Sequence, residues 1–274
     1  MIRSANHSSY PRIGDSPWDQ ELRHVARERE RGLADDAAVR AVEDAVASMM
    51  VAEQSRAFVD VVTDGQVRWS GPFSHVASRL GGVRLGGLSR WFESGLYDRR
   101  PVVSGPILRE APILVRDAQQ ALDVQPKALK VVLPGPVSLA HASRDRHYGA
   151  RVALARAYAE ALAAEARDLA AAGVSVFQLD EPMLCRHPGD APLVAETASV
   201  VFEAAGPRAT TIVPAGATII DARGKFLMPG LVDTNVHLSL YGGTLMADES
   251  YATRRGRPAG RATIGAGPGR GSAW

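Results

Sequence analysis

Short apolar runs alternate with long helix-forming segments over most of this 274-residue chain. The runs are rich in β-branched residues and stop at Gly, Pro or Asp, which is typical of buried strands. The segments between them are rich in Ala, Glu and Arg, which favour helices. Strands are predicted at 59–65, 99–107, 127–134, 174–180 and 209–213, and helices at 19–31, 35–58, 114–122, 149–173 and 191–206. This alternation predicts parallel βα units in an α/β fold.

Polar or glycine-rich residues stand at the carboxyl ends of the predicted strands. The clearest cases are Arg12–Gly14, Thr63–Gln66, Pro134–Pro136 and Gln178–Glu181. The carboxyl ends of parallel strands meet at one mouth of a (β/α)8 TIM barrel, and that mouth is where the fold builds its sites. We therefore predict an incomplete TIM-barrel-like (β/α)8 fold with a binding site at this mouth.

The sequence also argues against several classes of protein. A formal net charge of +2 is too small to indicate a nucleic-acid partner. No apolar run approaches the roughly 18 residues of a membrane span, and the first residues lack the apolar segment of a signal peptide. Cys185 is the only cysteine, so a secreted fold held by intramolecular disulfides is not expected. We expect a cytoplasmic protein without nucleic-acid or membrane partners.

The character of the chain changes after residue 212. Residues 213–245 are β-rich and contain no long helix-forming segment. After Thr253 the chain has five Arg, six Gly and no acidic residue. A tail of this composition cannot bury a core and is predicted to be disordered. We expect three parts: a truncated barrel at 1–212, a β segment at 213–245 and a disordered tail at 246–274.

Five motifs in order resemble the cobalamin-independent methionine synthase family over about residues 8–212. They are "SYPRIG", "VTDGQVRW", "RRPVVSGPI", "LPGPVSLA" and "FQLDEPML". "DEP" alone is a weak signal, but five motifs at plausible spacing are specific. The resemblance implies a (β/α)8 barrel that moves a methyl group from a folate to the thiol of homocysteine, a step in methionine biosynthesis.

The resemblance also implies a binding site for an amino-acid thiol. Asp180 would hold the amino group of this substrate, and Glu181 would help to shape the site. Many family members carry Glu at the position of Gln66, and Gln supplies no charge, so recognition of the ammonium group would be weaker or different here. Asp64 and Gln178 stand at the same strand ends and are predicted to belong to the site. A carboxylate that caps the next helix or pairs with an arginine is the structural alternative for Asp180 and Glu181.

Folate binding has candidate residues of its own. By resemblance, Trp69 and Gly135 would contact the folate, although aromatic residues at a barrel mouth often serve only in packing. Arg12 suits a carboxylate or a folate tail, because a guanidinium group binds oxyanions well. A structural salt bridge is an equal alternative for Arg12.

Zinc is the cofactor that the resemblance implies, but its ligands are not found. The metal holds the substrate thiol as a thiolate, since a free thiol of pKa about 8.5 is mostly protonated at neutral pH. The family's ligands begin with His-x-Cys in the strand after "DEP", where this chain has Pro214 and Gly216. Cys185 and His187 form a Cys-x-His pair in the loop after "DEP", which we interpret as a chance arrangement rather than a metal site. No cofactor is therefore predicted.

A second resemblance begins at about residue 209 and ends at about 245. "ATIIDARGKFLMPGLVDTNVHLSLYGG" resembles the start of the metal-dependent amidohydrolases. Their first barrel strand ends in His-x-His, where this chain has Asn235 and His237, and a lone histidine is not a metal site. The chain thus resembles part of one barrel joined to the start of another, as a gene fusion, a truncation or a shifted reading frame would produce.

Three hypotheses follow for the function. The first is a methyltransferase-family protein related to the folate–homocysteine methyltransferases, impaired because the zinc ligands are missing. The second is a non-catalytic barrel remnant or fusion product that binds a partner, with self-association through the open edge of the barrel. The third and weaker one is an amidohydrolase-like hydrolase that uses His237.

Overall fold

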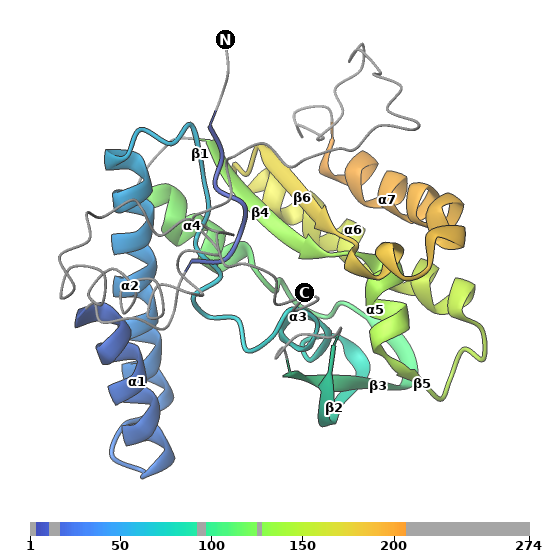
Figure 1. Cartoon of the computed structure of the whole chain (residues 1–274), viewed down its shortest axis with the longest axis horizontal. Coiled ribbons are helices and arrows are strands. Elements are labelled where there is room, and N and C mark those ends of the chain that lie inside the picture. The colour runs from blue at the N-terminus through green and yellow to red at the C-terminus, as the bar shows by residue number, and fades with distance from the viewer. Residues whose placement is uncertain (1–3, 11–16, 92–96, 125–127, 207–274) are drawn as a thin grey trace, which may run out of the picture.

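The structure, a computed structural model, describes residues 4–10, 17–91, 97–124 and 128–206. The predicted strand at 209–213, the predicted parts at 213–245 and 246–274, and the candidates Arg12 and His237 lie outside these residues. In the described part of the chain, no helix is both long and apolar enough to span a membrane. The strands form two three-stranded sheets, and the helices pack around them (Figure 1).

The first sheet is parallel and has the order β1-β4-β6. β4 lies in the centre, with Val61 of β1 beside Ala128 and with Phe177 and Asp180 of β6 beside Val131 and Pro134. Ala5 forms a parallel bridge to Val61, so the N-terminal segment extends this sheet at the β1 edge. The bounds of the strands are Val61–Val62 for β1, Ala128–Pro134 for β4 and Val176–Asp180 for β6. The parallel arrangement predicted for these three runs is confirmed.

The second sheet has the order β2-β3-β5 and corrects one prediction. The predicted strand at 99–107 is part of β3 (Tyr97–Leu108), but it pairs antiparallel with β2 (Gly81–Arg90) and parallel with β5 (Arg144–Asp145). It therefore lies outside the parallel sheet. Residues 91–96 are all that separate β2 from β3, and a parallel crossover needs a dozen or more residues. Such a short connection permits only an antiparallel hairpin.

Seven helices are described, and most lie where the sequence predicts them. The N-terminal pair, α1 and α2, packs together at one end of the molecule (Figure 1). α2 begins where Asp35 accepts a hydrogen bond from the Ala38 N–H over 2.8 Å, as an N-cap aspartate does. The helix bounds are Pro17–Glu30 (α1), Asp36–Arg56 (α2), Ser74–Ala77 (α3), Val115–Val124 (α4), Pro136–Ala142 (α5), Arg151–Ala171 (α6) and Ala191–Ala205 (α7). Short 3-10 turns at Pro182–Cys185 and Pro188–Asp190 connect β6 to α7.

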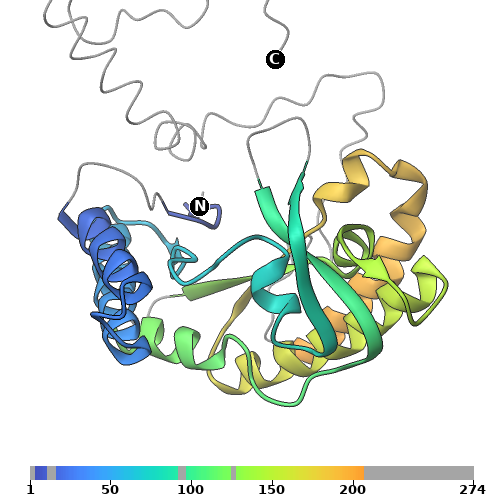
Figure 2. The same ribbon diagram turned by 90° about the horizontal axis from the view of Figure 1, so that it is seen from below.

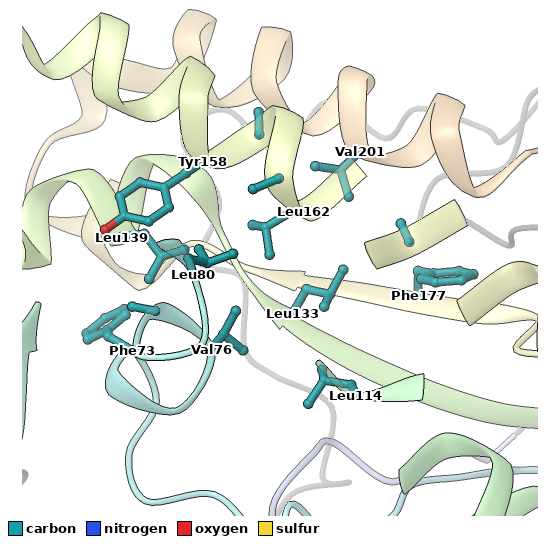
Figure 3. Packing of buried hydrophobic residues seen from close by; sticks show 14 of the residues in the cluster. Phe73, Val76, Leu80, Leu114, Leu133, Leu139, Tyr158, Leu162, Phe177 and Val201 are labelled. Carbon is teal, nitrogen blue, oxygen red and sulfur yellow. The ribbon is translucent and has the colours of Figure 1, made fainter. Parts of the chain in front are cut away.

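The main core lies between α6 and the sheets. Leu162 of α6 and Val201 of α7 approach Leu133 of β4 and Phe177 of β6 in Figure 3, and all four belong to one cluster of buried side chains. Tyr158 and Phe73 extend the cluster toward the second sheet. Burial of this apolar surface is the main favourable term in folding. One helix, α6, thus supports both sheets.

The described strands form an open sheet rather than a closed barrel. Within the described ranges, β6 pairs only with β4, and the segment around Ala5 pairs only with β1. The parallel sheet with its covering helices is the α/β arrangement that was predicted, whereas eight closed strands are not present in this part of the chain. The carboxyl ends of β4 and β6 lie side by side, and the predicted site residues follow them directly.

Candidate active site

A cavity of about 410 Å³ lies at the carboxyl ends of the parallel strands. It brings together three of the predicted site residues, Gln66, Trp69 and Asp180, from segments far apart in the sequence. Its walls also include residues that were not predicted, among them hydroxyl side chains of the N-terminal segment and Tyr97 of the second sheet. The lining residues are Ser8, Ser9, Gln66, Trp69, Ser70, Gly71, Pro72, Phe73, Tyr97, Val132, Pro134, Asp180 and Pro182.

Asp180 is the one charged side chain among the described residues that line the cavity. The Gln178 Nε2 group donates a hydrogen bond to Oδ1 of Asp180 over 2.7 Å. The main-chain carbonyl of Asp180 accepts from the Gly135 N–H, also over 2.7 Å. These two contacts fix the end of β6 against β4. Gln178 itself is buried and acts through Asp180, because it does not line the cavity.

Glu181 turns away from the cavity and caps a neighbouring helix. Its two carboxylate oxygens accept hydrogen bonds from the N–H groups of Val137 and Ser138, over 2.9 and 2.7 Å. These N–H groups belong to the first turn of α5, where the backbone has no partner of its own. Burial raises the pKa of Glu181, although these hydrogen bonds oppose the effect. The helix that Glu181 caps follows β4, whereas the sequence suggested the helix after "DEP" as the alternative.

Gly135 is required by this cap. A Cβ atom at position 135 would lie 2.0 Å from Cδ of Glu181, far inside van der Waals contact. Gly135 is therefore the residue that lets the Glu181 carboxylate reach α5. It does not line the cavity, and the prediction that it contacts folate has no support from its position. The "LPGP" and "DEP" motifs instead contact each other and connect β4, β6 and α5.

Gln66 occupies an unusual backbone conformation beside the cavity. Its φ angle is 52°, in the left-handed region that non-glycine residues seldom adopt, and Gly65 before it has a φ of 72°. The Asp64 carboxylate accepts a hydrogen bond from the Gln66 N–H over 3.1 Å, which stabilises this turn. Backbone strain of this kind concentrates at functional sites. The turn directs Gln66 toward the same cavity as Asp180.

Asp64 supports the site from behind rather than lining it. It borders a small space among Leu114, Ala118 and Leu129 and is absent from the walls of the main cavity. Burial raises the pKa of Asp64, while the N–H of Gln66 and the charge of Arg68 lower it. Of the predicted substrate-binding residues that are described, only Gln66 and Asp180 face the cavity.

Aromatic rings form another part of the wall, and one unpredicted carboxylate holds them in place without lining the cavity. Trp69 stacks on His75 with 5.0 Å between ring centroids, and Phe73 meets Trp91 edge to face at 5.5 Å. The buried Asp98 carboxylate accepts hydrogen bonds from the N–H groups of Phe73 and Ser74 over 2.9 and 3.0 Å. One face of Trp69 is thus occupied by His75, and Asp98 holds the segment that carries the aromatic residues.

Comparison with known proteins decides the family. The family described as "Cobalamin-independent synthase, Catalytic domain" matches residues 10–212, which is most of the chain. The chain belongs to the cobalamin-independent methionine synthase family. The match contains all the residues that line the cavity except Ser8 and Ser9.

Two curated relatives have names that agree with this family. The chain is 33% identical over 176 residues to the 5-methyltetrahydropteroyltriglutamate–homocysteine methyltransferase of Cronobacter sakazakii, covering 63% of this chain and 23% of that protein. It is 30% identical over 177 residues to a methionine synthase of Sulfurisphaera tokodaii, covering 64% of this chain and 52% of that protein. The chain therefore spans about half or less of the length of the curated relatives it matches.

Solved structures support the fold of this chain. A B12-independent methionine synthase from Shewanella in complex with selenomethionine matches with a TM-score of 0.57 and 24% identity, over 62% of this chain and 51% of that one. A vitamin-B12-independent methionine synthase from Listeria monocytogenes matches with a TM-score of 0.50 and 17% identity, over 74% and 62% of the two chains. The resemblance to amidohydrolases concerns residues that begin where the synthase match ends, and it stays a prediction.

The described residues do not fit a zinc ion. Cys185 is exposed, and the His187 ring stacks on His141 at 3.9 Å between centroids. His141 Nε2 lies 2.6 Å from Oδ2 of Asp190, and burial lowers the pKa of His141. Within the described ranges, no three His, Cys, Asp or Glu side chains are placed to hold one metal ion.

Proposed function

We propose that the cavity binds the methyl-accepting amino acid and that Asp180 holds its ammonium group. The observation that carries this proposal is the position of Asp180 as the one charged side chain among the described lining residues. Gln178 occupies Oδ1, so the other oxygen retains its acceptor capacity for a ligand. A hydrogen bond between an ammonium group and a carboxylate is roughly twice as strong as one between neutral groups.

The walls suit the rest of such a substrate. Trp69 and Phe73 supply apolar surface for an aliphatic, sulfur-containing side chain, and Gln66 offers an uncharged amide in place of a second carboxylate. The names of the relatives support this substrate class. One relative is named as a homocysteine methyltransferase, and a solved neighbour is in complex with selenomethionine, the selenium analogue of methionine.

We propose that the chain is related in activity to folate–homocysteine methyltransferases but is impaired in the transfer itself. Methyl transfer to a thiol requires the thiolate, because the thiol is a weak nucleophile. In the described part of the chain, the side chains at the cavity include no cation and no metal-ligand set that would stabilise a thiolate. Acceptor binding without efficient transfer is the function that this geometry supports.

Calorimetric titration of the full chain with L-methionine and with N-acetyl-L-methionine tests the role of Asp180. We expect methionine to bind and the acetylated form, which has no ammonium group, to bind much more weakly. Asp180→Asn should weaken methionine binding by about 10- to 100-fold, the value of a hydrogen bond to a charged group. Asp123→Asn, on the exposed surface of α4, is the matched control and should bind like the wild type. Equal affinities for the two ligands would refute the proposal.

Metal content tests the proposed impairment independently. Elemental analysis of the purified, dialysed protein should show no zinc that depends on Cys185. Stoichiometric zinc that disappears in Cys185→Ser would place a metal site in the loop after β6, and the proposed impairment would then be wrong. Methyl transfer from a methyltetrahydrofolate to homocysteine, measured on the same samples, should be close to background.

A further inference from the structure

The loop between β6 and α7, residues 181–190, begins at the cavity and is attached to α5. Pro182 of this loop lines the cavity. Close to it, Glu181 accepts its two hydrogen bonds from the first turn of α5, and the Met183 N–H donates to the Ser138 hydroxyl over 3.1 Å. The loop and α5 lie side by side in Figure 2. The cavity end of the loop is therefore held by the start of this helix.

The far end of the loop contacts the last turn of α5 through two histidines and an aspartate. The His187 ring stacks on the His141 ring with 3.9 Å between the centroids and 9° between the planes. Nε2 of His141 lies 2.6 Å from Oδ2 of Asp190, so a neutral His141 with its proton on Nε2 donates to that carboxylate. The His141 side chain is only 6% exposed. Both of its partners belong to the loop, so the burial of His141 depends on the position of the loop.

A proton on His141 is unfavourable while the loop covers this side chain. Burial lowers the pKa of His141 below its ordinary 6.5, and the charges of Arg151 on α6 and of His187 act in the same direction. Asp190 acts in the opposite direction through its hydrogen bond and its charge, but it does not outweigh burial. The stability that His141 contributes is therefore present above about pH 6.5 and is lost as the pH falls through the lowered pKa.

We propose that the stacked pair of His141 and His187 makes ligand binding at the cavity sensitive to pH. When His141 takes a proton, release of the loop from α5 returns the charged ring to water, so acid favours an open loop. The loop carries Pro182 and follows Asp180 directly, so its release disturbs the wall that holds the ligand. His141 is thus a positioning residue that acts through the loop. The proposal rests on the proposed function, because it assumes that the cavity binds an amino acid.

Glu181 also titrates in this loop, but its effect has the opposite sign. Burial raises the pKa of Glu181, so the stability that it contributes is present at low pH and is lost as the pH rises. Protonation of Glu181 therefore does not explain a loss of binding in acid, whereas protonation of His141 does.

Calorimetric titration of the full chain with L-methionine between about pH 5 and about pH 7.5 tests the proposal. We expect the wild type to bind methionine about tenfold more weakly at the acidic end of this range, a loss of about 1.4 kcal/mol. His141→Gln retains an Nε2 donor for Asp190 but takes no proton. The affinity of this variant should therefore stay constant across the range.

A second variant changes the proton affinity of His141 without replacing it. Asp190→Asn removes the negative charge that favours a proton on His141, so the loss of methionine affinity should occur at a lower pH than in the wild type. A purely structural contact would produce no such displacement of the pH profile. His24→Gln, at an exposed position of α1, is the matched control and should have the pH profile of the wild type.

The outcomes separate this inference from the proposed function. If methionine binds equally well at both ends of the pH range, only the inference is wrong. If methionine binds at neither end, the proposed function is wrong as well, and the inference falls with it. A loss of affinity in acid that persists in His141→Gln would assign the pH dependence to another group and would also refute the inference. A lower but pH-independent affinity of His141→Gln would support it, because removal of the titrating group should abolish the pH dependence.

Discussion

The two sheets of this molecule share one supporting helix, yet they differ in almost every other respect. The parallel sheet, β1-β4-β6, is largely buried. In its central strand β4, two half-buried residues interrupt an otherwise buried run, and none is exposed. The hairpin of the second sheet is exposed along one face, including Leu88 at 68% exposure. Strands that are covered on both sides read as continuous apolar runs, whereas strands with a solvent face alternate.

The two sheets also contribute different parts of the cavity. The parallel sheet places Asp180 at a strand end that main-chain hydrogen bonds hold in position. The second sheet supplies the facing wall through Tyr97 and through Asp98, which holds the segment of Phe73. The parallel sheet thus fixes the charged group, and the second sheet positions the aromatic residues that face it.

The largest expected effect is on the stability of the parallel sheet. Phe177 of β6 is 1% exposed and lies in the main cluster, so Phe177→Ala should lower the free energy of unfolding by about 3–5 kcal/mol. Leu88→Ala, on the exposed face of β2, should change it by no more than about 0.5 kcal/mol. Urea denaturation followed by circular dichroism measures both values. Similar losses for the two variants would show that the hairpin is as important to the core as the parallel sheet.

The parallel sheet was predictable from the sequence, and the second sheet was only half predictable. Val61, Val131 and Phe177 lie in apolar runs with turn residues after them, which is a strong local signal for a strand. β2 carries Gly81, Gly82, Gly86 and Gly87, and glycine disfavours strands, so nothing local predicts it. Its strand conformation comes from pairing with β3, which is a tertiary effect. The prediction that the run at 99–107 belongs to the parallel sheet was wrong for the same reason.

The site was predictable where it follows a strand end. Gln66 and Asp180 were found because they follow apolar runs, and both line the cavity. Glu181 is next to Asp180 in the sequence, but successive side chains point in opposite directions, so it reaches α5 instead. Tyr97 and Asp98 are the first residues of β3 and do not follow a strand end, so the pattern of polar residues after apolar runs does not indicate them. An acidic residue directly before "RRPVV" was the only available signal.

A second, smaller effect on stability is expected to distinguish two glycines, Gly135 directly after β4 of the parallel sheet and Gly87 in β2 of the second sheet. Gly135→Ala places a Cβ atom 2.0 Å from Cδ of Glu181, so the Glu181 carboxylate must leave the first turn of α5. Overpacking and the lost cap together should lower the free energy of unfolding by about 2–3 kcal/mol. Gly87→Ala in β2 meets no atom within 4 Å and should be neutral or stabilising by about 0.4–1 kcal/mol. Thermal unfolding of the two variants checks this, and a large loss for Gly87→Ala would contradict it.

The smallest effect expected is in the pH dependence of stability, where the two sheets should differ in sign. Burial raises the pKa of Glu181 above its ordinary 4.5, so the stability that this group contributes is fully present below about pH 4.5 and is lost as the pH rises through the raised value. Asp145 of β5 is the opposite case. Burial opposes its ionisation, but N–H groups of His147, Tyr148 and Gly149 outweigh burial and lower its pKa below 3.8.

The stability contributed by Asp145 is therefore present above about pH 3.8 and is lost as the pH falls through the lowered pKa. Urea titrations of the wild type, Glu181→Gln and Asp145→Asn between about pH 3 and 7 measure both effects. The stability difference between the wild type and Glu181→Gln should fall as the pH rises above 4.5, because only the wild type ionises a carboxyl group at position 181. The difference between the wild type and Asp145→Asn should fall as the pH drops below 3.8. A movement of both differences in the same direction with pH would contradict the opposite pKa shifts of Glu181, which is half-buried, and of Asp145, which accepts several main-chain hydrogen bonds.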